Sequence, residues 1–458
     1  MKILFANLPW WEVGHDSFRQ GIRAGSRWPF TKGPHHHPDE WRAGGYMPFP
    51  FFMASAAAYL KAKWPAWDIT LRDSIARGES YEVFVNAFQH DTPDCLVIET
   101  ATPSWKHDAD FCAAIHGMFP GVKIVITGTL VASCEFRLPD WAFAAVKGEY
   151  EKGVNHVIET QTRGIIDHML LSREELDSLP FPMFDGATTP YHYHDACPVY
   201  KDGGDDQFPH LQIWTSRGCP FKCVFCGWPA TMTGNDPDGD RPRSVRQHSS
   251  EWVEAMLVDR LRRATLAGMP YRSIYIDDDT FNLTDKHALA ISAVMKKIGL
   301  PWSAMCRADT CKPETWAIMR DSGCFGVKIG CESGSQRVVT EIVNKRLNLS
   351  DVENKWLPLL KELGFNVHTT WTVGLPGETQ AEAEETVAMI RRLYEKGLHR
   401  THQLSGTAEI EGTPLATLRH AGEGAELSKY PGAHVDANYS PSNDGQKKIE
   451  RLTRPALA

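Results

Sequence analysis

Short apolar runs alternate with helical patterns over the first 150 residues of the chain. The apolar runs fit strands at 2–8, 68–73, 95–100, 123–127 and 143–147, and the segments between them fit helices at 51–63, 81–89 and 106–118. Buried strands separated by helices are typical of a parallel sheet that is covered on both faces. The pattern therefore predicts an α/β fold whose first domain, 1–154, is a doubly wound, Rossmann-like sheet.

The alternation resumes in a second domain, predicted at 209–415. Its expected strands are 211–216, 273–277, 302–307, 326–331, 366–373 and 399–405, with helices in between. Six strand–helix units predict a partial (β/α)6 barrel, and such barrels carry their chemistry at the carboxyl ends of the strands. A linker is expected at 155–208 and a loose cap or tail at 416–458. Capping boxes are predicted at three helix starts: Ser172/Glu175, Ser350/Glu353 and Thr379/Glu382.

A long insert between the first strand and the first helix, 10–50, is rich in Gly, Pro, His and Trp. A loop of this length is usually functional or disordered. Its histidines, His35–His37, could ligate a metal, although solvated histidines are the simpler interpretation. Trp10, Trp11 and Trp28 either line a cavity between the domains or simply pack there.

The composition narrows the class of protein. The 458 residues carry a formal net charge of -8, which argues against nonspecific nucleic-acid binding. No signal peptide and no apolar run of the roughly 20 residues needed to span a bilayer is evident, so a cytoplasmic protein is expected. The 11 cysteines, an odd number, are expected to be reduced thiols or metal ligands rather than disulfides.

Three of these cysteines follow the first predicted barrel strand in the segment RGCPFKCVFC. Cys219, Cys223 and Cys226 have the spacing C-x3-C-x2-C. Thiolates are the usual ligands of iron–sulfur clusters, normally four to a cubane, so three leave one iron open for a cofactor or substrate. The spacing is also compatible with a zinc site completed by a distant residue such as His248, or with reduced structural cysteines.

The spacing C-x3-C-x-aromatic-C, with Phe225 as the aromatic residue, resembles the signature of the radical S-adenosylmethionine (SAM) superfamily. The resemblance implies a [4Fe–4S] cluster on the three cysteines, with SAM chelating the open iron through its amino and carboxylate groups. An electron from the cluster then cleaves SAM to a 5′-deoxyadenosyl radical. Phe225 is implied to pack near the adenine.

Four further motifs stand at the expected strand ends: IYIDDDTF, MCRAD, IGCESGS and WTVGLPGET. Taken singly, the aspartates fit a solvated turn, and GLPGET fits a plain loop before a helix. Together with the cysteines, they resemble the SAM-binding positions of the superfamily. The implied SAM-binding residues are Asp277, Asp278, Asp279, Arg307, Glu332, Ser333 and Gly374.

A doubly wound domain ahead of such a barrel resembles the cobalamin-binding class of the superfamily. ETATPSW, GTLVAS and KGEYE follow the third, fourth and fifth strands, while CVFCGWP, RPRS and DDDTF resemble the branch of the anaerobic magnesium-protoporphyrin cyclase and a hopanoid-associated enzyme. No D-x-H-x-x-G is present, so no histidine is marked to ligate cobalt. A vestigial domain that serves as a lid is the alternative. The implied cobalamin contacts are Asp73, Thr100, Thr102, Ser104, Gly128, Gly148 and Glu149.

The sequence therefore predicts a radical SAM enzyme. The resemblance implies a cobalamin-dependent methyltransferase that acts on an unactivated carbon, or on phosphorus, of a small-molecule metabolite in secondary metabolism. An electron donor such as flavodoxin or ferredoxin is the expected partner. The alternatives are a non-methylating reaction (cyclisation, rearrangement or 3-amino-3-carboxypropyl transfer) and a noncatalytic iron–sulfur or cobalamin sensor.

Overall fold

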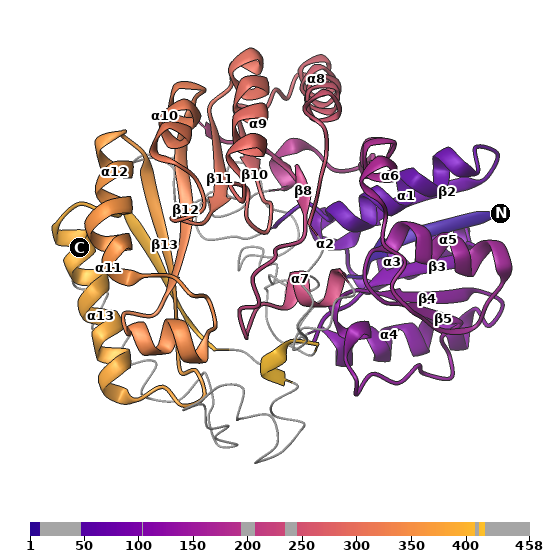
Figure 1. Cartoon of the computed structure of the whole chain (residues 1–458). Helices are drawn as coiled ribbons and strands as arrows, with labels where there is room; N and C mark the ends of the chain where they lie inside the picture. The colour runs from indigo at the N-terminus through magenta and orange to yellow at the C-terminus, as the bar shows by residue number, and fades with distance from the viewer. Residues whose placement is uncertain (10–46, 103, 194–206, 234–244, 408–411, 417–458) are drawn as a thin grey trace.

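The computed structural model describes residues 1–9, 47–102, 104–193, 207–233, 245–407 and 412–416 (Figure 1). The histidines His35–His37 and the residues Trp10, Trp11 and Trp28 lie outside this part of the chain. Two parallel six-stranded sheets, one from each half of the chain, organise the described residues. Figure 1 shows the short helix α7 (Gly227–Met232) between these two sheets.

The first sheet has the strand order β2-β1-β3-β4-β5-β6, and all of its strands are parallel. One apolar cluster joins one face of the sheet to α1 and α5, and a second cluster joins the other face to α3 and α4. The doubly wound fold is thus confirmed. The elements are β1 (Lys2–Asn7), α1 (Phe51–Lys63), β2 (Asp68–Asp73), α2 (Ser74–Arg77), α3 (Tyr81–His90), β3 (Cys95–Glu99), α4 (Trp105–Met118), β4 (Lys123–Thr127), η2 (Thr129–Ala132), β5 (Ala144–Val146), α5 (Tyr150–Thr160) and β6 (Gly164–Ile166).

The first sheet reaches further along the chain than the expected boundary after residue 154. Helix α5 runs across that boundary, and β6 adds a sixth strand within the predicted linker. Helix α6 (Arg173–Asp177) and the single turn η3 (Pro190–His192) follow. The capping box of Ser172 and Glu175 at the start of α6 is confirmed.

The second sheet has the order β14-β13-β12-β11-β10-β7, also entirely parallel, as expected for the partial barrel. Figure 1 shows its helices along the outer side of the curved sheet. The elements are β7 (His210–Ile213), α8 (Ser250–Leu266), β10 (Ser273–Ile276), α9 (Asp285–Ile298), β11 (Trp302–Cys306), α10 (Pro313–Asp321), β12 (Cys324–Glu332), η5 (Val338–Ile342), α11 (Leu349–Asp351), η6 (Val352–Trp356), α12 (Leu357–Glu362), β13 (Asn366–Val373), α13 (Gln380–Glu395) and β14 (Thr401–Gly406).

Two local predictions for this domain were wrong. The expected strand 211–216 breaks into β7 and a two-residue strand β8 (Ser216–Arg217), which pairs antiparallel with β9 (Arg246–Gln247). The helix expected to start with a box at Ser350/Glu353 is capped by Asn348, whose side chain accepts a hydrogen bond from the backbone N–H of Asp351. The box of Thr379 and Glu382 on α13 is confirmed.

The two faces of the barrel strands differ in polarity because alternate side chains point to opposite sides. Ile274, Trp302 and Val367 belong to the apolar cluster beneath the outer helices. Tyr275 follows Ile274 on β10 and Lys328 follows the cluster residue Val327 on β12; both point to the other side and are also buried. The interior of the barrel is therefore polar, unlike the packed interior of an ordinary (β/α)8 barrel.

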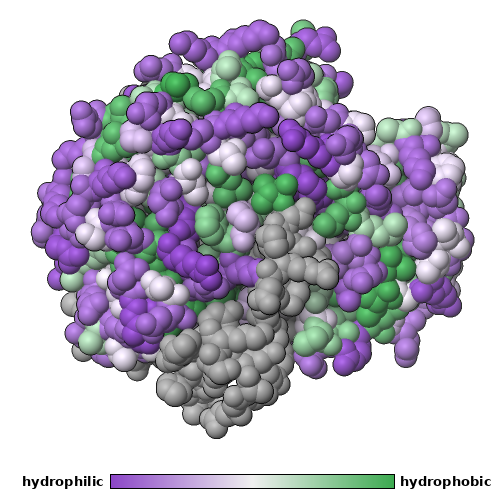
Figure 2. Space-filling model, viewed as in Figure 1, coloured by the Kyte–Doolittle hydropathy of each residue, from purple (hydrophilic) through white to green (hydrophobic). Residues whose placement is uncertain are grey.

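The face of the molecule in Figure 2 is mainly hydrophilic, with hydrophobic side chains in small separate patches. Such scattered patches are normal for a folded domain. None of the described helices combines the length and hydrophobicity needed to cross a membrane.

Candidate functional site

The three cysteines occupy the loop between β8 and α7, which follows the first barrel strand. Cys219 is buried, whereas Cys223 and Cys226 are partly exposed. The middle of this cluster loop (Cys219–Cys226) is fixed through Val224, whose N–H donates to the carbonyl of Val343 at 3.0 Å and whose carbonyl accepts from Leu415 N–H at 3.0 Å. The loop is thus held against the turn after η5 and against residues 412–416.

Charged side chains of both signs lie near the Cys223 thiol: Lys345 and Arg307 are positive, and Glu332 is negative. Burial raises the pKa of the Cys223 thiol to about 11, while the nearby Lys345 opposes this shift. Among the described residues, no three His, Cys, Asp or Glu side chains are grouped as ligands of one metal ion. His248 stacks on Trp252 with ring centroids 3.7 Å apart, so the structure gives no support to the zinc alternative with His248 as a ligand. A cubane differs from such a site because its thiolates each bind a different iron.

The three consecutive aspartates after β10 point to different partners. Asp277 accepts a hydrogen bond from Gln212 at 2.6 Å and one from the hydroxyl of Tyr275 at 2.9 Å. Asp279 accepts from the backbone N–H of Gly218, next to the first cysteine, at 2.9 Å. Both of these aspartates are partly exposed.

Asp278 has a different role from the one expected. Its carboxylate is 1% exposed and accepts four hydrogen bonds, from the backbone N–H and hydroxyl groups of Thr215 and Ser216, at 2.6 to 3.1 Å. These bonds use its acceptor capacity. Asp278 therefore fixes the chain that leads into the cluster loop.

Glu332 ends β12 and forms an ion pair with Lys345, with Oε1 and Nζ 2.6 Å apart. Burial lowers the pKa of Lys345, but its pairing with Glu332 and its proximity to Cys223 outweigh burial, so the pKa is raised. Arg307 donates to both carboxylate oxygens of Asp309, at 2.5 and 3.1 Å, and its guanidinium lies 4.0 Å from the Phe221 ring. Lys345 was missed in the sequence because no motif marks it.

Two other expected SAM contacts, Ser333 and Gly374, make hydrogen bonds within the protein. Ser333 is fully buried, lies 3.1 Å from the hydroxyl of Thr386 and accepts from the N–H of Ser335. Gly374 has a φ of 81°, and its N–H donates to the Glu378 carboxylate. Phe225 packs against the apolar cluster that contains Val224 and Leu375.

The carboxyl edge of the first sheet holds the residues expected to contact cobalamin. Asp73 caps α2 by accepting from the N–H of Ala76, and Thr100 donates its hydroxyl to Asp108 at 2.7 Å. Ser104 accepts from the N–H of Ala101 and donates back to its carbonyl. These three side chains are fully buried and stabilise the local turns, while Thr102 remains partly exposed.

The two glycines at this edge are required by close backbone contacts. A Cβ on Gly128, whose φ is +112°, would lie 2.0 Å from the Thr100 carbonyl oxygen. A Cβ on Gly148, whose φ is +76°, would lie 2.4 Å from the His168 ring and 3.0 Å from the Met232 carbonyl oxygen. Contacts within the protein thus explain both glycines without a ligand.

Glu149 is also placed differently from the expectation. It is 1% exposed, and its carboxylate accepts from Arg246 at 2.5 and 2.9 Å and lies 3.5 Å from a nitrogen of Arg217. A further bond comes from the backbone N–H of Leu171 at 3.1 Å. Ion pairing, not a ligand, occupies this carboxylate.

Three other polar side chains at the same edge have no hydrogen-bond partner within the described part of the chain. The unpaired groups are both amide atoms of Asn7 at the end of β1, the hydroxyl of Ser74 after β2 and the hydroxyl of Thr129 after β4. All three residues are at most 1% exposed. Buried polar groups are normally hydrogen-bonded. Because open α/β sheets bind ligands beyond the carboxyl ends of their strands, these three residues are candidates for ligand contacts.

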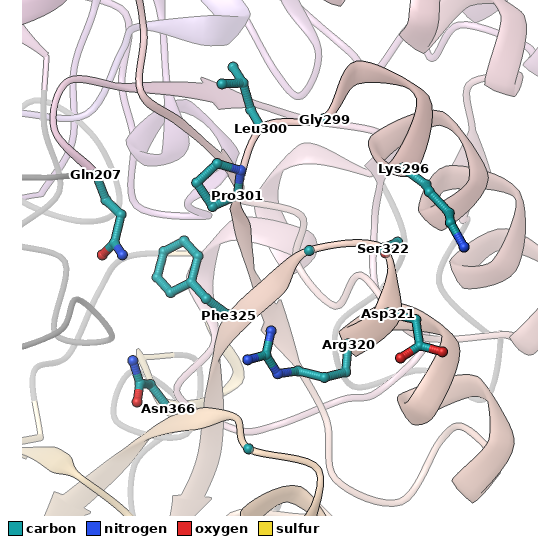
Figure 3. A pocket seen from close by; sticks show the side chains of 12 residues that line it. Gln207, Lys296, Gly299, Leu300, Pro301, Arg320, Asp321, Ser322, Phe325 and Asn366 are labelled. Atoms are coloured by element: carbon teal, nitrogen blue, oxygen red, sulfur yellow. The ribbon is translucent and has the colours of Figure 1, made fainter.

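A pocket of about 440 Å³ lies at the end of the barrel where the strands begin, opposite to the end that carries the three cysteines (Figure 3). Leu300, Phe325 and Asn366, at the amino ends of β11, β12 and β13, line it. It is therefore separate from the cluster loop, which follows a carboxyl strand end.

Comparisons with known proteins agree with the barrel assignment. Residues 214–390 match the family described as the radical SAM superfamily, a domain that implies a [4Fe–4S] cluster and SAM. The chain is 26% identical over 341 residues to an uncharacterized methyltransferase of Pyrococcus horikoshii, covering 71% of this chain and 70% of that protein. It is 31% identical over 219 residues to the cytidylyl-2-hydroxyethylphosphonate methyltransferase of Streptomyces wedmorensis, covering 45% of this chain but only 36% of that protein.

The branch indicated by the sequence motifs is also found. The anaerobic magnesium-protoporphyrin IX monomethyl ester cyclase of Rubrivivax gelatinosus is 23% identical, covering 74% of this chain and 64% of that protein. The hopanoid C-2 methylase of Rhodopseudomonas palustris is 21% identical, covering 78% of this chain and 62% of that protein. The resemblance stated from the motifs is therefore confirmed.

Solved structures share the whole two-domain fold. The radical SAM methyltransferase TsrM of Kitasatospora setae, solved with cobalamin and a [4Fe–4S] cluster, superposes with a TM-score of 0.61 at 16% identity, covering 91% of this chain and 74% of that one. Residues 214–390 thus match the radical SAM superfamily, the protein is an enzyme, and its fold is shared with a radical SAM methyltransferase that was solved with cobalamin bound.

Proposed function

We propose that this protein is a cobalamin-dependent methyltransferase that uses a [4Fe–4S] cluster and SAM to methylate an unactivated carbon, or phosphorus, of a small-molecule metabolite. The observation that carries the proposal is the pairing of two sites. The carboxyl edge of the first sheet, with its unpartnered polar side chains, adjoins the cluster loop through α7: the Thr231 carbonyl lies 3.0 Å from the ring of His168.

Cys219, Cys223 and Cys226 are the residues that would hold the cluster, and the bound cluster and SAM would supply a carbon-centred radical. Thiolates need compensating charge, which Lys345 and Arg307 offer near Cys223. Glu332 and Asp279 offer carboxylates at the ends of β12 and β10, on either side of β11, where they can accept hydrogen bonds from an ammonium or hydroxyl group.

The residues at the edge of the first sheet fit cobalamin, whose rim carries several carboxamides. Asn7 offers a free donor and a free acceptor, the pair that a carboxamide complements, and Ser74 and Thr129 add hydroxyls. A vestigial lid would have no need for such buried, unpartnered groups, which are costly in the absence of a ligand. We therefore favour cobalamin binding over the lid.

The polar barrel interior favours a polar substrate. Gln212 links Asp277 to the backbone N–H of Phe49 in the first domain, and the ammonium of Lys328 lies 4.5 Å from the Tyr275 ring. Such groups orient hydroxyl, amine or acidic functions more readily than hydrocarbon. This supports a functionalised metabolite as the substrate, with a reductant such as flavodoxin or ferredoxin as the electron source.

The test is anaerobic reconstitution with iron, sulfide and hydroxocobalamin, followed by gel filtration and metal analysis. We expect about four irons per chain and one retained cobalt. Incubation with SAM, a reductant and a panel of candidate metabolites should yield S-adenosylhomocysteine together with 5′-deoxyadenosine. Retained iron without cobalt, with 5′-deoxyadenosine or methylthioadenosine as the sole product, would replace the methyltransferase with the non-methylating alternative.

A further inference from the structure

Four buried charged side chains meet where the first domain contacts the barrel. The Arg217 guanidinium donates to both oxygens of Glu151, at 2.7 and 3.3 Å, and lies 3.5 Å from Glu149. Arg246 pairs with the other side of Glu149 at 2.5 and 2.9 Å. Because two positive charges meet two negative ones, the group, here called the interdomain charge cluster (Glu149, Glu151, Arg217, Arg246), is balanced.

The interdomain charge cluster is enclosed by protein. Its four residues are 1%, 0%, 2% and 8% exposed, in the order given. Two residues of α1 complete the contacts of Arg217: its guanidinium stacks 4.7 Å from the Phe52 ring and donates to the Ser55 hydroxyl at 3.2 Å. Arg217 therefore reaches across the domain boundary to both α1 and the start of α5.

The chain positions of these residues connect the two proposed cofactor sites. Arg217 pairs with Arg246 across the β8–β9 ladder, and Cys219 follows two residues later. Glu149 is the third residue after β5, at the carboxyl edge of the first sheet. One ion-paired group thus links the entry of the cluster loop to the edge that we assign to cobalamin.

The barrel also holds this stretch of chain, through the three residues that follow Asp277. Asp278 binds Thr215 and Ser216, Asp279 binds Gly218, and the Thr280 hydroxyl lies 3.5 Å from the Cys219 sulfur. The barrel thereby sets the loop relative to its own strands. The interdomain charge cluster sets it relative to the first domain.

Stability alone does not account for such a group. Burying ion pairs costs desolvation energy that their attraction barely offsets, and hydrophobic residues of similar volume are often at least as stable. What a bidentate arginine pair adds is a fixed geometry, since the planar guanidinium matches a carboxylate in one orientation. A role in positioning the cluster loop accounts for both the desolvation cost of these ion pairs and their place between the two domains.

We propose that Arg217, through Glu149 and Glu151, is a positioning residue that fixes the cluster-binding loop relative to the ligand edge of the first sheet. The proposal rests on the proposed function for the identity of the two cofactors. Arg217 itself contacts neither of them; it acts through the two-residue connection to Cys219.

The experiment compares the reconstituted wild type with Arg217→Lys, which keeps the charge but loses the bidentate geometry and the stacking on Phe52. The matched control is Arg72→Lys, because Arg72 forms a similar bidentate pair with Glu79, at 2.9 and 2.8 Å, within the first domain. The first readout is the rate of iron loss to a chelator, well below the unfolding temperature of each variant. The second is the magnetic dipolar coupling between cob(II)alamin and the reduced cluster, which reports their distance.

Arg217→Lys should lose iron about tenfold faster than the wild type, as is usual when a residue that supports metal ligands is changed, and its distance distribution should broaden. Arg72→Lys should stay within about twofold of the wild type. Equal iron loss and equal distance distributions in the two variants would overturn the proposal. If wild type binds no cobalt, the proposed function fails, and the iron-loss comparison still decides the role of Arg217.

A second variant covers the case in which Arg217→Lys does not fold. Arg217→Met combined with Glu151→Met removes one charge of each sign, which avoids the uncompensated buried charge of a single substitution. The same two outcomes apply: faster iron loss and a broader distance distribution support the positioning role, and wild-type values for both exclude it.

Discussion

Single residues at the barrel rim show why the cofactor contacts could be predicted only in part. The sequence motif identified Glu332, but not its ion pair with Lys345, which lies 13 positions later and outside any motif. Glu332 has a φ of 71°, a left-handed conformation that costs a residue other than glycine about 1–3 kcal/mol. Strain of this kind is typical of functional sites, so the backbone supports the assignment that the motif made.

We expect Glu332→Gln to weaken SAM binding about tenfold to a hundredfold, since the loss of a charge-assisted hydrogen bond costs about 1.5–3 kcal/mol. The dissociation constant would be measured by anaerobic calorimetry on the reconstituted protein. Glu353→Gln is the control, because Glu353 pairs with Arg392 and Lys396 on the outer helices. Unchanged affinity in folded Glu332→Gln protein would place Glu332 outside the SAM site.

A second residue, Glu378 of the GLPGET motif, gives a pH-dependent prediction. Burial raises the pKa of this carboxyl to about 7 from its ordinary value of 4.5, although it accepts hydrogen bonds from the N–H groups of Gly374 and Leu375. The folded state therefore holds a proton that the unfolded state releases between about pH 4.5 and pH 7. Over this window, Glu378 makes the folded protein less stable as the pH rises.

The free energy of unfolding should thus fall by roughly 3 kcal/mol more in wild type than in Glu378→Gln as the pH rises from 4.5 to 7. Urea denaturation of the apo-protein at several pH values measures this difference. Glu382 does not interfere, because its hydrogen bonds with Arg337 lower its pKa to about 2. Parallel pH profiles of wild type and variant would contradict the prediction.

At the scale of elements, periodicity located the regular strands and helices well. The bounds of β2, β4, β13 and α1 are as expected, because each carries a clear hydrophobic pattern: alternating in β2 and nearly continuous in β4 and β13. The short elements β6, β8 and β9 were missed, since two or three residues carry no period. Their existence depends on partners distant in the chain: Arg217 of β8 pairs with Arg246 of β9.

The start of α11 shows that a capping residue, too, can be misplaced when it is predicted from sequence alone. Both Asn348 and Ser350 suit an N-cap position, and Glu353 completes a capping box only with Ser350. The structure selects Asn348, whose side chain accepts from the N–H of Asp351, while Ser350 lies exposed within the helix. Sequence spacing alone could not decide between two caps separated by two residues.

Asn348→Ala should therefore lower the free energy of unfolding by about 1 kcal/mol, the usual cost of losing an N-cap. Ser350→Ala should change it by less than about 0.5 kcal/mol, as for an ordinary surface site. Chemical denaturation of the two variants makes the comparison directly. A larger loss of stability in Ser350→Ala than in Asn348→Ala would show that Ser350 caps the helix, as the sequence indicated.

At the scale of the whole molecule, the site is assembled from contacts that no local pattern encodes. The cysteines lie within eight residues of one another, so their chemistry is visible in the sequence. The interdomain charge cluster, in contrast, joins positions 66 and 97 residues apart. Glu149, Thr100 and Gly128 stand in motif-like segments, yet their side chains or backbone are needed for the protein's own contacts. Of the residues with unpartnered groups at this edge, Asn7 and Ser74 lie outside the quoted motifs, and Thr129 lies in GTLVAS but was not among the expected contacts.

Asn7 lies where the order of the first sheet reverses, between β1 and β3, and doubly wound sheets bind ligands at this position. Its amide is fully buried without a partner within the described residues, which costs roughly 1–3 kcal/mol in the absence of ligand. We therefore expect Asn7→Leu to leave the apo-protein at least as stable as wild type.

The same substitution should weaken hydroxocobalamin binding by about tenfold or more, because a carboxamide of the ligand would lose its complement in a buried site. Thermal unfolding of the apo-protein and anaerobic titration with hydroxocobalamin measure the two effects. The control is Asn155→Leu: Asn155 accepts from the Trp64 indole and donates to Glu159, so its loss should destabilise the fold and leave cobalamin affinity unchanged. A destabilised Asn7→Leu protein with wild-type affinity would show that the amide supports the sheet rather than a ligand.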